Sequence, residues 1–431
     1  MSGTVIGGGH VVIDGVTVSH EPLVVDGGVV VASPAADADI VDATHCVVTP
    51  GLVNAHHHLL QSAFRTLPGT RFVPMRDWLR TMADGYRRVG VDPELTAAAA
   101  AVGVAESLLC GVTTIADHHL TWPPGQDPVQ LAGAALGAAR ELGARLVHVR
   151  GTARDDPDTA AESVEQIHAA FFAGSAGGVS PDGMRQLAVG PSGVHADGPA
   201  TFAALGEVAA RLGLRRRTQA NEQIDVEVAA QTYGRRPLEL LDEWGWLGGD
   251  VTLAHLCEVT PAEIALVARS GATVTHAPGC DVPMGWGVSP VAAMLAAGID
   301  VGLGTSGGGS NDAGHLLADA RLAMQVSGLA APVGARAVLA MATEGSARGL
   351  GRGDLGHLRP GAVADLCVWE CGDVHDAGVA DPVDGLLWAS PGRRPRDVMV
   401  AGVWVVRDGV LRTGESRSLA RRLRELLAAR S

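Results

Sequence analysis

The chain of 431 residues contains no lysine, so arginine supplies all 33 of its basic side chains. This absence excludes three kinds of chemistry. A carbamylated lysine cannot bridge two metal ions, a lysine cannot form a Schiff base with a substrate, and a lysine cannot act as the general base. Composition alone therefore excludes a two-metal site of the lysine-bridged kind.

Paired cysteine motifs and long apolar runs are missing as well. The six cysteines show no Cys-x-x-Cys spacing, which favours buried thiols in a reducing compartment over disulfides or a zinc knot. No apolar run approaches the length of a membrane span and no charged-then-apolar leader is present, so we expect a cytoplasmic protein with no membrane partner. The net charge of -14 and the scattered arginines argue against a nucleic-acid partner.

The middle of the chain alternates short, β-branched apolar runs with Ala- and Leu-rich helical stretches. Eight such βα units favour a closed α/β fold, the (β/α)8 TIM-like barrel, over an open sheet. We expect the barrel to span residues 50–354. Its predicted strands are residues 47–55, 112–117, 145–150, 186–190, 214–220, 251–255, 272–276 and 301–304.

Both ends of the chain differ from the middle in their sequence pattern, because they contain short β-type runs broken by Gly and Asp. Residues 1–49 and 355–415 are predicted to form one small β-sandwich domain from both termini. The tail, residues 416–431, has leucines at helical spacing with arginines between them. It is predicted to be an amphipathic helix docked on the protein.

Polar side chains gather at the predicted C-terminal ends of the barrel strands, where this fold keeps its chemistry. His56 and His58 alternate at the end of the first strand, so they point the same way and can grip one ion. For each single residue the alternative is a satisfied core or loop position, and for Arg150 it is a structural ion pair. The run 215–217 is all arginine, and we expect it at a solvated strand start.

Several segments resemble the amidohydrolase superfamily over nearly the full length of the chain. They are Asn-Ala-His-His-His-Leu-Leu-Gln at 54–61, Asp-His-His at 117–119, Arg-Gly-Thr at 150–152, the glycine-rich segment at 302–312 and the segment at 355–366. Within the superfamily they are similar to the 8-oxoguanine deaminase and triazine aminohydrolase branch, which includes hydroxyatrazine and S-adenosylhomocysteine deaminase-like proteins. The resemblance implies an enzyme, expected as a homodimer, that acts on carbon–nitrogen bonds other than peptide bonds.

The resemblance also implies a metal site, and this chain departs from it. Members of the branch use one zinc or iron ion, held by the His-x-His pair, a strand-five His and a strand-eight Asp. Gln219 and Ser306 stand at the latter two positions. An amide and a hydroxyl are poor replacements toward zinc. We therefore predict that the cofactor is absent or weakly held; if a metal is bound, the expected ligands are His56, His58 and His255.

Three functions stay open at this point. The first is metal-independent acid–base chemistry on a small purine- or triazine-like substrate: C–N hydrolysis, elimination, isomerisation or cyclisation. The second is a zinc- or iron-dependent deaminase with an atypical ligand set, and the third a non-catalytic binding protein or partner subunit. The predicted catalytic residues are Glu222, His255, His56 and His58. The predicted substrate-binding residues are Gln61, His119, Arg150, Gln219, His276, Ser306 and Asp312.

Overall fold

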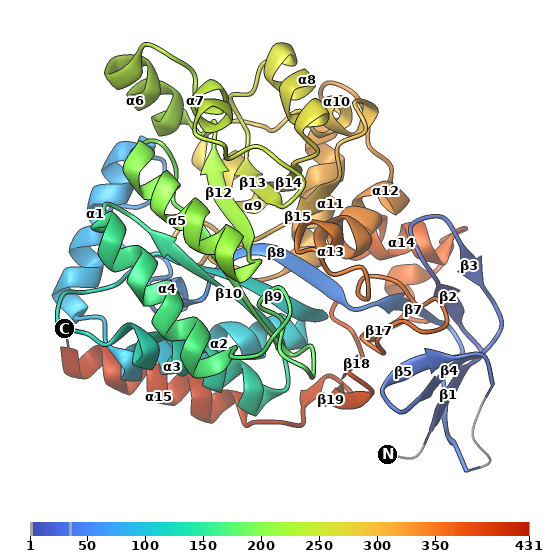
Figure 1. Ribbon diagram of the computed structural model, residues 1–431. Coiled ribbons are helices and arrows are strands. Elements are labelled where there is room, and N and C mark those ends of the chain that lie inside the picture. Colours follow the sequence, from blue (N-terminus) through green and yellow to red (C-terminus); the bar gives the residue numbers. More distant parts are fainter. Residues whose placement is uncertain (1–2, 34–36, 431) are drawn as a thin grey trace.

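The computed structural model describes residues 3–33 and 37–430, and its centre is a parallel barrel (Figure 1). The eighth strand is split: β15 pairs with β14, while β16 pairs with β8 and closes the ring. The predicted (β/α)8 barrel is confirmed. Its strands are β8 (Leu52–His58), β9 (Val112–His119), β10 (Arg145–Thr152), β11 (Arg185–Pro191), β12 (Arg215–Ala220), β13 (Val251–His255), β14 (Thr273–His276), β15 (Val301–Leu303) and β16 (Ser306–Gly307).

Helices surround the barrel, and capping residues explain where several of them begin. Asp92, Asp127 and Asp156 each accept a backbone hydrogen bond from the first turn that follows, and each precedes a proline whose fixed φ suits that turn. The helices are α1 (Met75–Val89), α2 (Pro93–Leu109), α3 (Pro128–Leu142), α4 (Pro157–Phe171), α5 (Pro199–Leu212), α6 (Gln223–Tyr233), α7 (Pro237–Glu243), α8 (Pro261–Ser270), α9 (Pro278–Met284), α10 (Val291–Ala296), α11 (Leu316–Ser327), α12 (Ala335–Ala340) and α13 (Ser346–Gly349), with η1 (Leu59–Ala63) and the π-type turn η2 (Met341–Gly345).

Two further sheets form the predicted small β domain from both termini. In Figure 1 the blue N-terminal strands lie beside the red C-terminal ones at one end of the molecule. One sheet has the order β5-β4-β1-β6 and the other β20-β19-β18-β17-β7-β2-β3. Their strands are β1 (Thr4–Gly7), β2 (His10–Val12), β3 (Val18–Ser19), β4 (Leu23–Asp26), β5 (Val29–Val31), β6 (Asp39–Asp42), β7 (Cys46–Pro50), β17 (Leu366–Glu370), β18 (Asp397–Val400), β19 (Val403–Arg407) and β20 (Val410–Leu411).

One predicted strand is wrong in its extent. Residues 47–55 do not form a single barrel strand, because the chain breaks after Pro50. Residues 46–50 form β7, which pairs with β17 of the small domain, and the barrel strand β8 begins only at Leu52. Gly51 lies at the break, where a Cβ would stand 2.3 Å from the hydroxyl oxygen of Thr113. Only glycine allows this close approach between the two strands.

The barrel and the small domain are joined by a buried ion pair. Arg145 on β10 donates to both carboxylate oxygens of Asp365, over 2.7 and 3.0 Å, and both side chains are almost fully buried. The same carboxylate accepts the backbone N–H of Ala401 at 2.7 Å. This bidentate pair fixes the register between the two parts of the chain.

The C-terminal tail forms α15 (Ser416–Arg430), preceded by η3 (Val374–Asp376) and α14 (Pro382–Trp388) in the same half of the chain. Leu423 is buried in a cluster with Leu95 of α2. Arg430 pairs with Asp92 at 2.8 Å, so the end of the helix is also held. Residues 1–2, 34–36 and 431 of the predicted small domain and tail lie outside the described residues.

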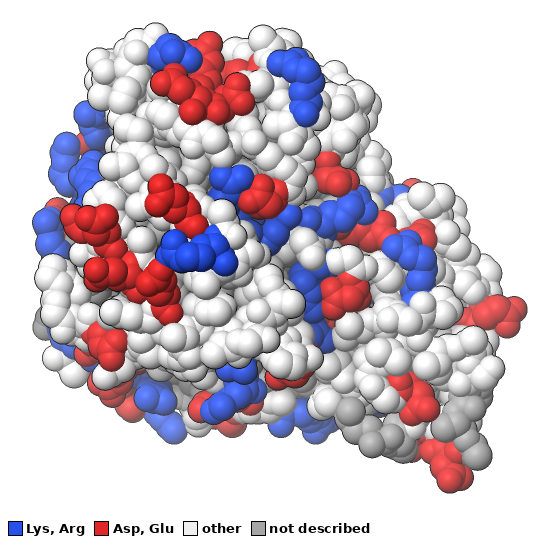
Figure 2. Space-filling view, viewed as in Figure 1, with Lys and Arg blue, Asp and Glu red and all other residues white. Residues whose placement is uncertain are grey.

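Three general features concern the cysteines, the described helices and the surface charge. All six cysteines lie within the described part of the chain and are free thiols. Among the described helices, none combines the length and the apolar character needed to cross a bilayer. Figure 2 shows arginines and acidic side chains interspersed over the viewed face, with no continuous basic stripe on it.

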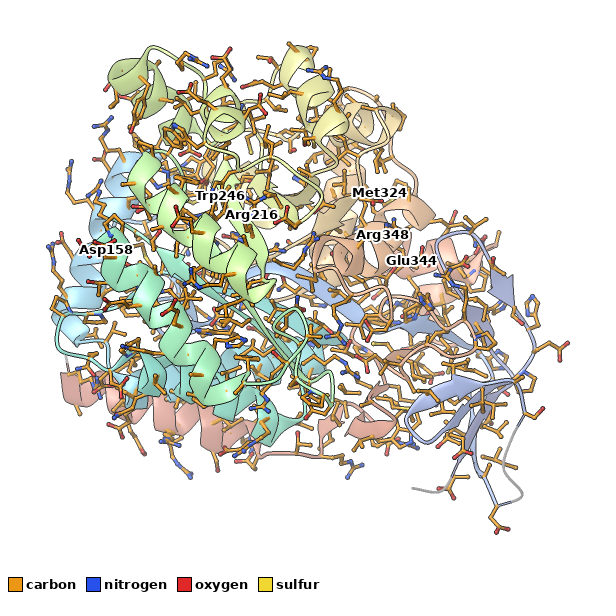
Figure 3. All side chains as sticks on the ribbon, viewed as in Figure 1. Asp158, Arg216, Trp246, Met324, Glu344 and Arg348 are labelled. Atoms are coloured by element: carbon orange, nitrogen blue, oxygen red, sulfur yellow. The ribbon has the colours of Figure 1, made fainter. Side chains whose placement is uncertain are left out.

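The arginine run on β12 differs from the expected solvated strand start. Arg216 fits it in part: it pairs with Asp250 at 2.7 Å and its guanidinium lies 5.3 Å from the centre of the Trp246 ring, a contact that can be followed in Figure 3. Arg217, however, is buried in the barrel and donates to the backbone oxygen of Ala55. Strand alternation places Arg217 on the same side as Gln219, which is the barrel interior.

Candidate active site

A cavity of about 1010 Å³ lies at the C-terminal ends of the barrel strands. Part of its wall is apolar and aromatic: the rings of Trp78 and Trp286 meet edge to face with centroids 5.4 Å apart. The part formed by the strand ends is polar. Of the predicted site residues, the cavity is lined by His58, Gln61, His119, Gln219, Glu222, His255 and Ser306.

His255 belongs to this polar part of the cavity and is held through both of its ring nitrogens. It is the last residue of β13, and its ring is fully buried. Its Nδ1 lies 3.0 and 3.1 Å from the two carboxylate oxygens of Asp281, and its Nε2 lies 3.2 Å from the side-chain oxygen of Gln219. Both partners accept, so both ring nitrogens donate and the ring is an imidazolium.

Electrostatics agree with this assignment. Burial by itself would lower the pKa of His255, but the carboxylates of Asp281 and Glu222 outweigh it and raise the pKa to about 9. The amide of Gln219 is held in its orientation because its NH2 group donates to the backbone oxygen of Ser192 at 3.0 Å. Its oxygen therefore faces His255.

Glu222 lies directly before α6, where β12 turns into the helix. Its carboxylate oxygen is 3.8 Å from Nε2 of His255. Burial raises the pKa of Glu222 to about 7, although the His255 cation opposes the rise. The turn that presents it is held by Asn221, whose amide donates to Glu263 at 3.0 Å. A carboxylic acid with this pKa can accept or donate a proton at neutral pH.

Backbone strain accompanies the strand ends that carry these groups. Asn221, His255, Leu256 and Ser306 all have positive φ values of 49°, 75°, 57° and 54°. Such conformations are uncommon for residues other than glycine and tend to cluster at functional sites. Here they bend the chain so that three strand ends face one cavity.

His56 and His58, on the first barrel strand β8, are neutral. The rings of His56 and His58 lie edge to face with centroids 4.8 Å apart. His58 donates from Nδ1 to the backbone oxygen of His118 at 2.7 Å, which leaves a lone pair on Nε2. Burial lowers the pKa of His58 to about 4, and that of His56 well below the usual range. Nε2 of His56 is buried without a hydrogen-bond partner among the described residues.

A second histidine–carboxylate pair lies on the other side of Glu222. His195 lines the cavity, and its Nδ1 lies 2.7 Å from the carboxylate of Asp225 in the first turn of α6. The backbone N–H of His195 donates to the same oxygen at 3.0 Å. His195, Glu222 and Asp225 each have one possible metal-ligand atom, and these three atoms lie within 4.8 Å of one another.

Four of the predicted residues are not part of the cavity lining: His56, Arg150, His276 and Asp312. Arg150 forms the structural ion pair that was its alternative: it donates to Asp155 at 2.6 Å and lies 4.4 Å from the centre of the Trp122 ring. Asp312 is engaged by Arg71 and by the backbone N–H of Thr66. These contacts leave Arg150 and Asp312 out of the function proposed below.

Sequence reasoning did not single out Asp281, His195 or Asp225. Asp281 lies five residues after His276, in the helix that follows β14, and no motif marks it as the partner of His255. Asp225 had a weak signal, because it lies three residues after Glu222 in the first turn of the next helix. His195 follows the end of β11, and catalytic residues of this fold lie at such C-terminal strand ends. No spacing rule, however, pairs His195 with Asp225.

The fold and this strand-end site define a barrel hydrolase, and comparisons with known proteins give its family. The amidohydrolase family profile matches residues 47–405, so the chain belongs to the amidohydrolase family. It is 34% identical over 401 residues to the 8-oxoguanine deaminase of Pseudomonas aeruginosa, covering 90% of this chain and 88% of that protein. It is 34% identical to the 5-methylthioadenosine/S-adenosylhomocysteine deaminase of Halobacterium salinarum, covering 94% and 92%. The predicted family, and the prediction of an enzyme, are confirmed.

A solved relative shows the same architecture with a metal. The zinc complex of the atrazine chlorohydrolase from Arthrobacter aurescens TC1 superposes with a TM-score of 0.90 at 31% identity, covering 98% of this chain and all of that one (100%).

The residues of this chain do not fit a zinc cage of the kind that the resemblance implies. His56 and His58 could offer two neutral nitrogens, but the Gln219 oxygen already accepts from His255, and both His255 nitrogens donate. Two groups of described residues bring three possible donor atoms within 4.8 Å: His255 with Cys280 and Asp281, and His195 with Glu222 and Asp225. Neither contains His56 or His58. Two good ligands are fewer than the three that catalytic zinc requires.

Proposed function

We propose that this protein acts on a carbon–nitrogen bond of a small, nitrogen-rich ring by general acid–base catalysis that needs no metal ion at the His56–His58 position. The observation that carries the proposal is the contact set of His255. Asp281 and Gln219 hold this ring as a cation directly beside position 219, where the resemblance implies a metal ligand. A fixed cation next to two neutral histidines disfavours a divalent ion.

Glu222 and His255 divide the roles. Glu222 has a pKa of about 7, so it can take a proton from an attacking water and return it within one turnover. His255 keeps its proton at neutral pH and supplies a fixed positive charge. A substrate oxygen or nitrogen that displaces the Gln219 amide would receive the Nε2 hydrogen bond, where developing negative charge is stabilised.

The substrate class is proposed from the cavity and from the relatives. Trp78 and Trp286 offer aromatic surfaces on which a planar ring can stack. His58 presents a hydrogen-bond acceptor and His255 a donor, which suits a ring that alternates N–H and C=O or C=N groups. Relatives at 30% identity or more are named as deaminases of 8-oxoguanine, of isoxanthopterin and of 5-methylthioadenosine/S-adenosylhomocysteine.

The experiment is a turnover assay on 8-oxoguanine, isoxanthopterin, S-adenosylhomocysteine and a chlorotriazine, with and without prior chelation. We expect turnover that survives chelation. Glu222→Gln keeps the shape of the side chain but cannot carry the proton, so kcat should fall about 10²- to 10⁴-fold. Glu227→Gln is the matched control, because Glu227 is an exposed carboxylate on α6, the helix that directly follows Glu222, and it pairs with Arg76. Full activity of both Glu222→Gln and His255→Asn would refute the proposal.

A zinc-dependent reaction is the second candidate, and one observation favours it. Nε2 of His56 is buried and unpaired in the described structure, and an unpaired buried nitrogen is costly unless something binds it. Zinc held by His56 and His58 would supply a Lewis acid and an activated water. Complete loss of turnover on chelation, restored by added zinc, would select this candidate.

A further inference from the structure

We propose that His195, positioned by Asp225, is a second acid–base group of this site and works on the opposite side of Glu222 from His255. This inference rests on the proposed function, and it adds a catalytic residue to it. Neither the sequence motifs nor the resemblance points to His195. The assignment comes from the way three side chains of two segments meet at the cavity wall.

The geometry of the pair is that of a histidine held for proton transfer. Asp225 is completely buried and accepts from both the ring Nδ1 and the backbone N–H of His195, at 2.7 and 3.0 Å. These two bonds fix the tautomer and the ring plane, because the carboxylate can only accept. Nε2 makes no hydrogen bond to any described residue, while the ring lines the cavity, so this nitrogen is free for a substrate.

Two details show that the arrangement is built into the local backbone. Gly193 has φ +147°, and a Cβ there would stand 2.8 Å from the Asp225 carboxylate and 2.9 Å from Nδ1 of His195. The second carboxylate oxygen of Asp225 is buried without a partner in the described part of the chain. The carboxylate therefore has no structural task other than holding the 193–195 segment and its imidazole.

The charges that face His195 come from three elements. Asp225 lies on α6, Glu222 precedes it, and Asp197 lies in the same loop as His195. Asp197 is itself occupied, since it accepts from the Thr152 hydroxyl at 3.0 Å and from the backbone N–H of Arg154 at 3.0 Å. Burial lowers the pKa of His195, but the carboxylates of Asp225, Glu222 and Asp197 outweigh it, so the pKa is raised.

This arrangement supplies what a metal-free C–N hydrolysis needs. In the addition step, the water oxygen bonds to the carbon of a ring C=N group, the π electron pair of that bond moves to the ring nitrogen, and the water proton goes to Glu222. In the elimination step, the pair on the ring nitrogen re-forms the C=N bond, and the C–N bond to the leaving group breaks with its electron pair on the leaving nitrogen, which takes the Nε2 proton of His195. Glu222 is then protonated and His195 neutral, and a proton passed from Glu222 to His195 through a solvent water restores both; a nitrogen of His195 and a carboxylate oxygen of Glu222 lie within 4.8 Å of each other, a distance that one water can bridge. The sum is water consumed and an amine or ammonia released.

A substrate-free measurement tests the pair first: ¹⁵N NMR of the histidine side chains of the whole protein, with the His195 signal identified by its loss in His195→Gln. We expect His195 to titrate above the ordinary histidine pKa, with Nδ1 protonated throughout. Asp225→Asn should lower this pKa by more than about one pH unit, and Glu222→Gln should lower it by less. Glu227→Gln, the same charge change at an exposed site on α6, should leave it unchanged. A His195 pKa that responds to neither Asp225→Asn nor Glu222→Gln would overturn the inference.

Turnover then separates this inference from the proposed function. On any ring of the panel that is converted, His195→Gln should lower kcat about 10²-fold or more with little change in KM. Asp225→Asn should move the alkaline limb of the kcat profile to lower pH, because His195 then loses its proton more easily. If Glu222→Gln loses activity while His195→Gln keeps it, the inference about His195 is wrong and the proposed function stands. If Glu222→Gln and His255→Asn both stay active, the proposed function fails independently of the NMR result.

Discussion

Replacing Asp281 by Asn should remove the charge that holds His255 as a cation, and the effect should depend on pH. The two hydrogen bonds of 3.0 and 3.1 Å lose their negative acceptor, while the ring stays fully buried. Without a carboxylate, burial decides. His58 and His276 lie in the same interior, and burial lowers the pKa of each to about 4. We therefore expect the pKa of His255 in Asp281→Asn to fall below 6.5.

The magnitude follows from the wild-type value. A pKa of about 9 against an ordinary 6.5 corresponds to about 3 kcal/mol of extra stabilisation of the cation in the folded state. A histidine whose pKa is raised by folding stabilises the folded state below its unfolded pKa, and this contribution is lost as the pH rises through the folded pKa. The substitution should therefore cost about 3 kcal/mol more at about pH 6 than above about pH 9.5.

Urea unfolding of wild type and Asp281→Asn at both pH values measures this difference. Asp300→Asn is the matched control, because Asp300 is an exposed partner of Arg348 at 2.7 Å and an exposed ion pair contributes little. Its cost should be small and the same at both pH values. Equal destabilisation of Asp281→Asn at both pH values would refute the assignment of His255 as a cation.

Gln219→His with Ser306→Asp should bind about one zinc ion per chain that survives dialysis, because the new imidazole releases Nε2 of His255 and completes a family-like ligand set; a folded double variant without zinc would contradict this. Arg145→Met should lower the free energy of unfolding by about 3–5 kcal/mol, measured by urea denaturation, because it leaves the Asp365 carboxylate buried and unpaired. The kcat profile should rise with pH through about 7 as Glu222 ionises, and this limb should vanish in Glu222→Gln.

The barrel was predictable because its signal is repeated along the chain. Each strand is short, apolar and followed by a helix, so an error in one unit does not change the architecture. The break at Pro50 was missed because residues 47–55 are apolar almost throughout, and periodicity cannot show that one half pairs with a strand more than 300 residues away. The position of Gly51 against Thr113 is visible only in three dimensions.

The candidate site, like the barrel, has a part that could be predicted from the sequence and a part that could not. Gln219, Glu222, His255 and Ser306 were predicted from their places at strand ends, and only the resemblance implied that 219 and 306 are replaced ligand positions; the structure brings all four to the cavity wall. Arg150 shows the limit: its position after a strand predicted a ligand contact, but Asp155 neutralises it within the loop.

Partner choice is the part that spacing does not determine. Asp281 and Asp225 hold the two histidines from helices that follow different strands, and their contacts depend on how those helices pack. Arg217 was expected with its two neighbours at a solvated strand start because three successive arginines are unusual for a buried strand, yet its side of the strand is the barrel interior. Burial lowers the pKa of this guanidinium to about 9.

Elemental analysis of the protein purified without chelator, combined with turnover of the same sample, tests directly whether the reaction needs a metal ion. We expect zinc and iron well below one ion per chain after dialysis, with turnover unrelated to the metal content of different preparations. About one tightly held zinc or iron ion per chain, with turnover proportional to it, would refute metal-independent catalysis and make His56 and His58 metal ligands.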